Sequence, residues 1–363
     1  MPEALRGRVV AVQANFCEVV PDPGDTLSGE PRLSEAVLGE RLPSNPVLLP
    51  PRLLCTRRSR LNKSGQQVCV GDRVRLEALD PTTARATVVA VEPRRNLLSR
   101  PAVANVSRVV VVVALEQPAL DPLQLTRFLI SAESTGAAVQ LVFSKADCVA
   151  PALVAAWLQR VQAWGYQALA VSVQRGEGLQ ALRQALDQPG IAVLCGPSGV
   201  GKSSLLNALI PALALRVAAV SGRLQRGRHT TRHVELFPFG RGALLADSPG
   251  FNRPLPLRDS GALVQGFPEL RRALAAGGCR FSNCRHLADP GCALAESWDR
   301  QELYRQCLLE VETLAARPPE TGREAGLRQR GHRLEPRLDP NLRRSSRRRD
   351  RQGQGQTDPW EDT

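Results

Sequence analysis

Residues 196–203 combine glycines with a lysine and a serine in a pattern typical of loops that bind phosphate groups. They match G-x-x-x-x-G-K-[ST]. The glycines let backbone N–H groups turn inward around phosphates, and the positive end of the following helix faces the same point. Lys202 is expected to reach the β- and γ-phosphates, and Ser203 to hold Mg²⁺. The predicted phosphate-binding residues are Gly196, Pro197, Ser198, Gly199, Val200, Gly201, Lys202 and Ser203.

Asp247 and Gly250 occur where a second part of such a site is expected. Residues 247–250 read Asp-Ser-Pro-Gly and follow an apolar segment that predicts a strand. The aspartate is expected to approach Mg²⁺, and the glycine to lie near the γ-phosphate. Between this segment and the phosphate loop, Thr230 and Thr231 are both candidates to complete the Mg²⁺ shell and to order a switch loop.

Residues 144–147, Ser-Lys-Ala-Asp, are the candidate motif for reading a guanine base, which is usually written N-K-x-D or T-K-x-D. The carboxylate of Asp147 can face the N1–H and the exocyclic amine of guanine. The stem of Lys145 can cover the base, and Ser144 and Ala146 complete the motif. Ser172 follows the next predicted strand and is the candidate for a second base-side loop. If Asp147 is instead an ordinary loop residue, the phosphate loop fits an ATPase or a kinase.

Both base-side segments precede the phosphate loop, which is an unusual order. A circular permutation explains it, because a sheet can keep its arrangement while the chain enters elsewhere, provided the original termini lie close together at the surface. In this order the second switch leads directly into a cysteine-rich region, so a change of nucleotide can move that region.

Cys279, Cys284, His286 and Cys292 are spaced as C-x4-C-x-H-x5-C. Three thiolates and an imidazole suit a closed tetrahedral Zn²⁺ site. Because four protein ligands leave no open coordination position, we predict a structural ion, one per chain. The remaining cysteines show no such grouping and are expected to be core or incidental thiols.

The elements that position these residues change in type along the chain. Short β-like runs between residues 5 and 91 predict a small barrel or sandwich, interrupted by a Pro-rich loop at about 21–51. From residue 106 strands alternate with helical segments, as in a doubly wound α/β domain. The region after about residue 260 is expected to be mainly helical. From about residue 318 the chain is polar and Arg-rich and is predicted to be a largely disordered basic tail.

The formal net charge of +13 favours a polyanionic partner, either a nucleic acid or an anionic membrane surface. No apolar run is long enough to cross a membrane and the N-terminus does not resemble a secretory signal, so a cytoplasmic protein is expected. The predicted barrel carries Arg57, Arg58, Arg60 and Lys63 in one segment but few aromatic residues. This combination indicates contact with an RNA backbone more than base stacking.

These motifs in this order resemble the RsgA/YjeQ family of circularly permuted, ribosome small-subunit-dependent GTPases. The resemblance covers about residues 1–310 and extends the phosphate-loop match to Ser204. It implies an N-terminal OB-fold, a permuted P-loop GTPase domain and a C-terminal helical zinc-binding domain. We expect these at residues 1–95, 96–258 and 259–317, followed by the basic tail at 318–363. It also implies GTP hydrolysis in late maturation of the small ribosomal subunit, stimulated by that particle and its rRNA, by a monomer. No membrane partner is expected, because the sequence contains no long basic amphipathic helix.

The resemblance also bears on catalysis and specificity. The family carries an apolar residue where many GTPases have a water-orienting glutamine, and Phe251 fits that place. His229, within the matching segment 227–231, is the candidate catalytic residue. Ser144 replaces the family's usual Asn, which is expected to weaken guanine affinity or selectivity, and Ser248 replaces Thr. The alternative function is a nucleotide-switched rRNA-binding protein with negligible hydrolysis of its own.

Overall fold

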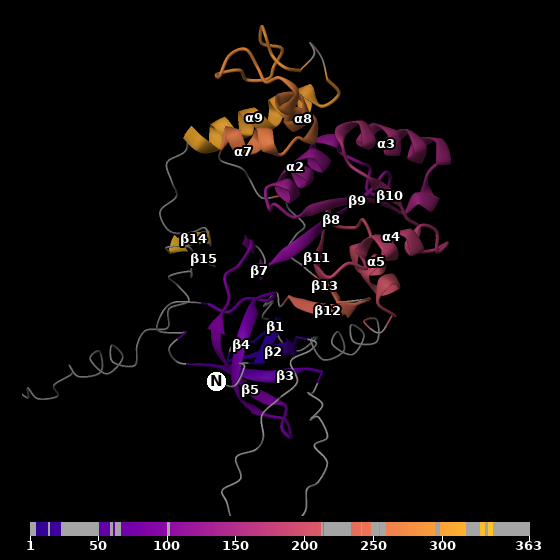
Figure 1. The fold of residues 1–363 in the computed structure, drawn as a ribbon. Helices are drawn as coiled ribbons and strands as arrows, with labels where there is room; N and C mark the ends of the chain where they lie inside the picture. Colours follow the sequence, from indigo (N-terminus) through magenta and orange to yellow (C-terminus); the bar gives the residue numbers. More distant parts are fainter. Residues whose placement is uncertain are drawn as a thin grey trace, which may run out of the picture.

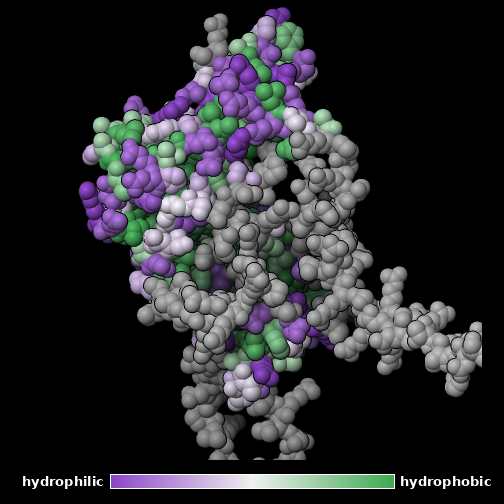
Figure 2. Space-filling model, turned by 180° about the vertical axis from the view of Figure 1, so that it is seen from behind, coloured by the Kyte–Doolittle hydropathy of each residue, from purple (hydrophilic) through white to green (hydrophobic). Residues whose placement is uncertain are grey.

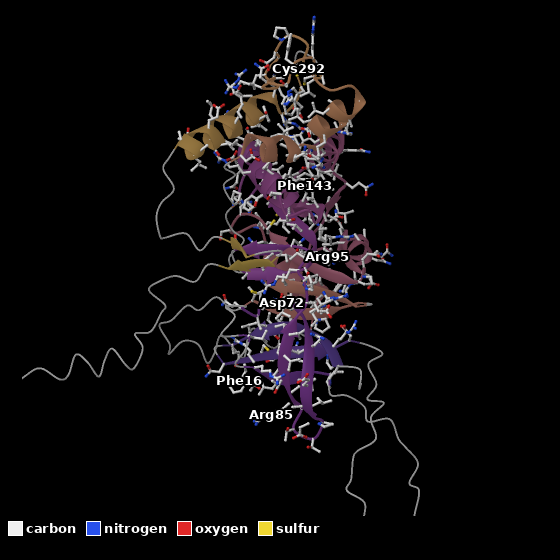
Figure 3. The ribbon with its side chains drawn as sticks, turned by 60° about the vertical axis from the view of Figure 1, so that its left-hand side comes forward. Phe16, Asp72, Arg85, Arg95, Phe143 and Cys292 are labelled. Carbon is white, nitrogen blue, oxygen red and sulfur yellow. The ribbon has the colours of Figure 1, made fainter. Side chains whose placement is uncertain are left out.

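The computed structural model of the chain describes residues 5–13, 15–22, 51–58, 61, 67–99, 102–211, 213, 234–240, 242–247, 254, 259–294, 298–316, 327–330 and 333–336. These ranges form three parts along one long axis, with a β-barrel at one end, an α/β sheet in the middle and a helical part at the other end (Figure 1). Figure 3 shows the same order, because Arg85 of the barrel and Cys292 of the helical part lie near opposite ends. The fold class expected from the sequence is confirmed.

The middle part is built on five parallel strands in the order β10-β9-β8-β11-β13. Their bounds are β8 (Val106–Ala114), β9 (Ala138–Ser144), β10 (Ala168–Ala170), β11 (Gly190–Cys195) and β13 (Ala243–Asp247). Strand β12 (Glu235–Phe239) joins the sheet antiparallel to β13. Because the parallel strands all point the same way, their carboxyl ends meet at one edge, where ligands bind in folds of this kind.

Helices cover both faces of this sheet, as the unbroken apolar strands predict. They are α2 (Pro122–Glu133) and α3 (Pro151–Trp164) on one face, and α4 (Leu179–Leu186) and α5 (Lys202–Leu209) on the other. Strand β8 shows why both faces need cover. Its Val109, Val111 and Val113 pack towards α2 and α3, whereas Val110 and Val112 pack towards α4 and α5.

The N-terminal part is a closed barrel, so the sandwich alternative is excluded. Its strands run in the order β1-β2-β3-β5-β4, and pairing of β1 with β4 closes the ring. They are β1 (Leu5–Val12), β2 (Phe16–Pro21), β3 (Leu53–Arg57), β4 (Arg73–Asp80) and β5 (Arg85–Val91). Successive side chains of a strand point to opposite sides of the barrel wall. On β4, Val74 and Leu76 are buried in the barrel, whereas Arg73 and Arg75 face solvent.

The barrel and the α/β sheet are continuous. Strand β12 pairs with β1 through Ala11 and Glu235. Arg52 secures this junction, because its Nη1 lies 2.8 Å from a carboxylate oxygen of Glu18 on β2 and 2.9 Å from one of Glu235 on β12. A small hairpin of β6 (Leu97–Ser99) and β7 (Ala102–Ala104) follows the barrel in the chain.

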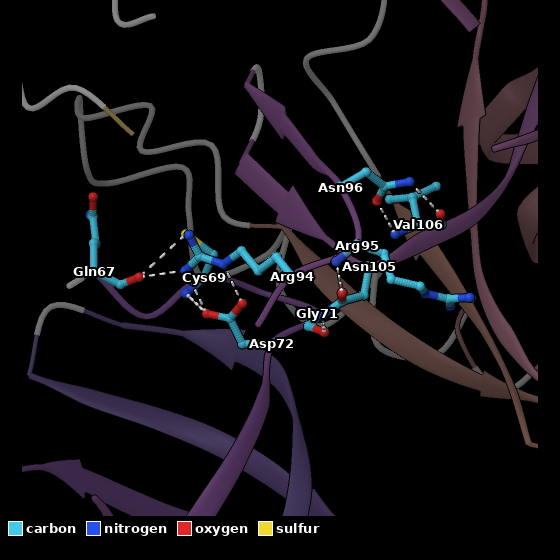
Figure 4. Close-up of polar contacts among 9 residues, drawn as sticks. All are labelled: Gln67, Cys69, Gly71, Asp72, Arg94, Arg95, Asn96, Asn105 and Val106. Atoms are coloured by element: carbon cyan, nitrogen blue, oxygen red, sulfur yellow. Dashed lines mark hydrogen bonds and ion pairs between the residues drawn. The ribbon is translucent and has the colours of Figure 1, made fainter. Parts of the chain in front are cut away.

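A buried ion pair holds the turn that leads into β4 (Figure 4). Nε and Nη2 of Arg94 lie 2.6 and 2.8 Å from the two carboxylate oxygens of Asp72, whose side chain is fully buried. The backbone N–H of Cys69 also donates to Asp72, at 2.7 Å. Burial raises the pKa of Asp72, and the hydrogen bonds from Arg94 oppose that rise. The adjacent Gly71 has φ +88°, and a Cβ there would lie 2.1 Å from the carbonyl oxygen of Ala104.

We expect Arg94→Ala to lower the free energy of unfolding by about 3 kcal/mol, because it leaves the buried carboxylate of Asp72 without its counter-charge. Urea denaturation of the two proteins measures the difference. Arg95→Ala is the matched control, since the neighbouring Arg95 is exposed and should change stability by less than about 0.5 kcal/mol. Equal effects of the two substitutions would contradict a structural role for the Asp72–Arg94 pair.

The C-terminal part consists of α7 (Ser260–Gln265), α8 (Pro268–Ala276) and α9 (Gln301–Ala316), which pack against Ile130 of α2. Arg300, just before α9, is fully buried, with its guanidinium carbon 4.6 Å from the ring centre of Trp164 on α3 and 4.5 Å from that of Phe267. It also forms a bidentate ion pair with Glu269 on α8, at 2.6 and 2.5 Å. The helical part is thereby anchored to the helix that follows the candidate base motif.

Strands β14 (Leu327–Arg330) and β15 (Arg333–Pro336) form a hairpin inside the segment expected to be a largely disordered tail, and the rest of that tail lies outside the described residues. Most of the Pro-rich loop at 21–51 does so too. Within the described ranges, no helix has the length and apolar character needed to cross a membrane. On the face seen in Figure 2, hydrophobic residues lie among hydrophilic ones over the upper part of the molecule.

Candidate nucleotide site and metal centre

The predicted phosphate loop lies at the carboxyl edge of the sheet, between the end of β11 and the start of α5. Gly196 is buried with φ +139°, and a Cβ at this position would lie 1.9 Å from the carbonyl oxygen of Val112 on β8. Only glycine allows this close approach. Gly199 and Gly201 also have positive φ angles, of 83° and 91°. The loop therefore turns sharply while keeping its outer residues, Ser198 and Gly199, exposed to solvent.

Lys202 and Ser203 occupy the first turn of α5. The ammonium nitrogen of Lys202 lies 2.8 Å from the carbonyl oxygen of Gly196 and 2.6 Å from that of Pro197. The lysine thus folds back over its own loop, where phosphate oxygens would replace the carbonyls as partners. Ser203 and Ser204 are exposed at the positive end of the helix, accessible to a ligand from solvent.

The candidate base motif lies directly against this loop, although the two are far apart in the sequence. Lys145 adopts a left-handed conformation with φ 54°, and its Nζ lies 2.8 Å from the carbonyl oxygen of Gly199 and 2.7 Å from that of Gln117. Ser144 at the end of β9 is buried, and its Oγ lies 2.6 Å from the carbonyl oxygen of Val200. Strands β8, β9 and β11 therefore bring their carboxyl ends together around one site.

Asp147 and Ser172 come together at the base side. A hydrogen bond from Ser172 lowers the pKa of Asp147, so this carboxyl is ionised at neutral pH and can accept two N–H groups of a base. Ser172 is fully buried, and its Oγ also accepts the backbone N–H of Arg175 at 3.1 Å. The sequence predicted each residue separately, and the backbone N–H of Ala146 donates to the carbonyl oxygen of Val171 at 3.1 Å, which brings the two segments together.

One contributor to this site was missed by sequence reasoning. Gln117, on the loop that follows β8, offers its backbone carbonyl to Lys145. A backbone acceptor has no side-chain signature, and the only available signal was the position of Gln117 after a buried strand that points to the same edge.

Several predicted residues cannot be placed. His229, Thr230, Thr231 and Gly250 lie outside the described residues, as do Ser248 and Phe251. Asp247 ends β13, whose residue Ala246 pairs with Val193 of β11, so its backbone lies at the same edge of the sheet as the phosphate loop. These assignments stay predictions.

The predicted metal ligands converge at the far end of the helical part. Cys279, Cys284, His286 and Cys292 each offer one ligand atom, and these atoms all lie within 4.8 Å of one another. The Nδ1 of His286 is 3.5, 3.7 and 3.9 Å from the sulfurs of Cys279, Cys284 and Cys292. Ligand atoms of a tetrahedral Zn²⁺ site stand about 3.5–3.8 Å apart, given its bond lengths of about 2.0–2.3 Å. The group can therefore hold a metal ion.

Backbone N–H groups approach two sulfurs of this Cys/His group, and burial favours the neutral form of its histidine. Backbone N–H groups of Ala293 and His286 each point at a sulfur, of Cys279 and Cys284 respectively, at 3.4 Å. Burial lowers the pKa of His286, so its imidazole is neutral at pH 7, as a metal ligand must be. Its ring also packs edge-on against Tyr304 of α9, with ring centres 6.3 Å apart, which connects the group to the helical core.

Comparison with known proteins decides the family. The sequence model of the RsgA GTPase family matches residues 91–255. A protein named small ribosomal subunit biogenesis GTPase RsgA, from Parasynechococcus marenigrum, is 52% identical, and the match covers 89% of this chain and all of that protein. The chain belongs to the RsgA family. A protein of the same name from Thermosynechococcus vestitus is 45% identical, with 96% of this chain and 95% of that protein covered.

Solved structures agree with the RsgA assignment. The crystal structure of YjeQ from Thermotoga maritima has a TM-score of 0.66 and 26% identity, and the match covers 87% of this chain and all of that one. YloQ, described as a circularly permuted GTPase, also has a TM-score of 0.66, at 24% identity over 87% of this chain and 98% of that one. These two structures share the fold of this chain, and membership of the RsgA GTPase family makes the chain a GTP hydrolase.

Proposed function

We propose that this chain hydrolyses GTP during biogenesis of the small ribosomal subunit, in the cytoplasm. One observation carries the guanine part of this proposal, namely that the candidate base motif meets the phosphate loop, with Nζ of Lys145 at 2.8 Å from the carbonyl oxygen of Gly199. The ribosomal part is supported by the names of relatives that match over nearly their whole length. The high positive charge suits a particle rich in rRNA.

In this proposal each part of the site has a separate task. The loop at 196–204 and Lys202 bind the phosphates, and Asp147, oriented by Ser172, reads the guanine. Ser203, Asp247 and one of the two threonines 230 and 231 hold Mg²⁺, which would neutralise charge developing on the phosphates. His229 orients the attacking water, because Phe251 has no polar group to do so.

We assign a separate role to each segment of the chain. We assign residues 1–95 and the tail to rRNA contact, 96–258 to the GTPase and 259–317 to a helical domain. We assign Zn²⁺ to the Cys/His group, since three thiolates and one imidazole are the donor set this ion prefers. The ion would then be structural, since all four positions are filled by the protein.

The test is hydrolysis of GTP and ATP by the purified protein, with and without small ribosomal subunits. We expect the subunits to raise GTP turnover by at least about tenfold and ATP turnover not at all, since groups supplied in trans accelerate GTPases by up to about 10⁵-fold.

In the same assay Asp147→Asn should lower kcat/KM for GTP by roughly 10- to 100-fold, by loss of a charged acceptor. Large ribosomal subunits are the control particle.

Each possible result has a definite meaning. GTP turnover that ignores the small subunit would contradict the ribosomal part of the proposal and favour a nucleotide-switched binding protein. ATP turnover equal to that of GTP would contradict the base-reading role of Asp147.

A further inference from the structure

Strand β12 has a different neighbour on each side. Its first residue, Glu235, is the register partner of Asp247 on β13 and of Ala11 on β1. Asp247 is the carboxylate that we assign to Mg²⁺, and Ala11 belongs to the barrel. Neighbouring strands keep a spacing of about 4.7–4.9 Å, so a shift of the backbone at Ala11 is passed on to Glu235 and Asp247. This row of three residues connects the barrel to the Mg²⁺ side of the nucleotide site.

A bulge in β1 includes this strand in two cores. The register of β1 with β2 shifts directly after Val9. Val9 packs inside the barrel, whereas Val10 is fully buried in the core of the α/β sheet. The same α/β core contains Val234 and Leu236, the residues on either side of Glu235. Bulges re-aim side chains in this way, and here the bulge brings a barrel residue into the core that holds β12.

The side chain of Glu235 reinforces the junction. One oxygen of its carboxylate lies 2.9 Å from Nη1 of Arg52, and the same nitrogen lies 2.8 Å from a carboxylate oxygen of Glu18 on β2. The three side chains are between 25 and 34% exposed, so salt screens these pairs less than it screens fully exposed ones. Because Arg52 directly precedes β3, its guanidinium connects β12 to two strands of the barrel.

We propose that Glu235 is a positioning residue that links the binding of rRNA by the barrel to the hydrolysis of GTP. It acts through Asp247, its partner on β13. This inference rests on the proposed function, since it concerns how the small subunit stimulates the site. The described pairing of β1 with β12 consists of one register position, so the contact of Glu235 with Arg52 forms a large part of the link.

The first experiment measures GTP turnover of the full chain and its Glu235→Gln variant at saturating small ribosomal subunits. The variant should keep its unstimulated turnover and its dissociation constant for the subunit. Its stimulated kcat should fall by about three- to tenfold, as expected for a residue that carries coupling between two sites. Combining Arg52→Glu with Glu235→Arg exchanges the charges between the same two positions and should restore stimulation.

Glu77→Gln is the matched control. Glu77 on β4 lies 3.3 Å from Arg58, so the substitution removes an ion pair within the barrel and leaves β12 untouched. Stimulation by the subunit should be unchanged. Thermal unfolding of each variant separates lost coupling from lost folding.

A second measurement needs no ribosome. Coupling between two sites is reciprocal, so the nucleotide must also affect the barrel strand. Hydrogen exchange of residues 9–12 should differ between the GDP complex and the complex with a non-hydrolysable GTP analogue. Glu235→Gln should reduce that difference, and Glu77→Gln should not.

Two results would overturn the proposal. One is a Glu235→Gln variant that is folded, binds the subunit and is stimulated like the parent protein. The other is hydrogen exchange of β1 that is identical in the two nucleotide complexes of the parent protein. Failure of the proposed function looks different, since GTP turnover of the parent protein that ignores the small subunit contradicts the ribosomal role whatever the exchange of β1 shows.

Discussion

Lys202→Ala is expected to lower GTP affinity by at least about a hundredfold, the largest effect of any single substitution in the nucleotide site. The lysine ammonium already lies within 2.8 Å of two loop carbonyls, at the centre of the phosphate-binding turn. Two charge-assisted hydrogen bonds to phosphates, each worth about 1.5–3 kcal/mol, would disappear together. Isothermal titration with a non-hydrolysable GTP analogue measures the loss.

The Lys202→Arg variant tests whether a positive charge alone is enough to bind the phosphates. The chain has 48 lysines and arginines in total, but lysine occurs only at positions 63, 145 and 202. A guanidinium is broad and planar, whereas an ammonium is compact, so arginine should not restore binding in so tight a turn. Arg305→Ala, on the exposed side of α9, is the control for a lost positive charge and should bind normally. Full affinity in the Lys202→Ala protein would refute the assignment of the loop.

Removal of metal from the Cys/His group is the second large effect. We expect the purified protein to contain about one zinc per chain, and Cys284→Ser to lose it and to melt at a lower temperature. Structural zinc contributes roughly 10–16 kcal/mol to small zinc domains, so the segment around the four ligands should unfold locally without it. Metal analysis and thermal unfolding, before and after dialysis against a chelator, measure both effects.

The control for this experiment is Cys148→Ser, because Cys148 is exposed and stands outside the group. It should keep the metal and the melting temperature. Helices α7, α8 and α9 should remain folded in the metal-free protein, since their core packs on Ile130 of α2. A preparation that is free of metal and yet unchanged in stability would contradict a structural ion.

Hydrogen exchange of the helical part would locate the unfolded segment. Protection should fall between Cys279 and Cys292 and persist around Arg300, whose buried contacts with Trp164 and Glu269 do not depend on the metal. Loss of protection throughout α9 would instead mean that the Cys/His group supports the whole helical part.

Local sequence patterns predicted much of the architecture. The alternation of apolar strands and helical segments from residue 106 predicted an α/β unit. The first of its helices, α2, begins at Pro122 because Asp121 caps it, accepting from the N–H of Leu123 at 2.9 Å. The hairpin of β14 and β15 was missed, since each four-residue strand contains a single leucine and leaves no apolar alternation to detect. The choice of barrel over sandwich also needed the structure, because closure depends on pairing between β1 and β4, far apart in the chain.

The sequence by itself determined which functional groups the protein has and the order in which they occur. They are the phosphate loop at 196–203, the carboxylate of Asp147 and the four candidate metal ligands, with the base motif placed before the phosphate loop. Residue types and short spacings carry that information directly. Only the tertiary structure decided which residues contact one another across these parts, as in the hydrogen bond of Ser144 with Val200 and the ion pair of Arg52 with Glu235. Such contacts join strands that are neighbours only in the folded sheet, and several use backbone carbonyls, which every residue possesses and no sequence pattern can mark.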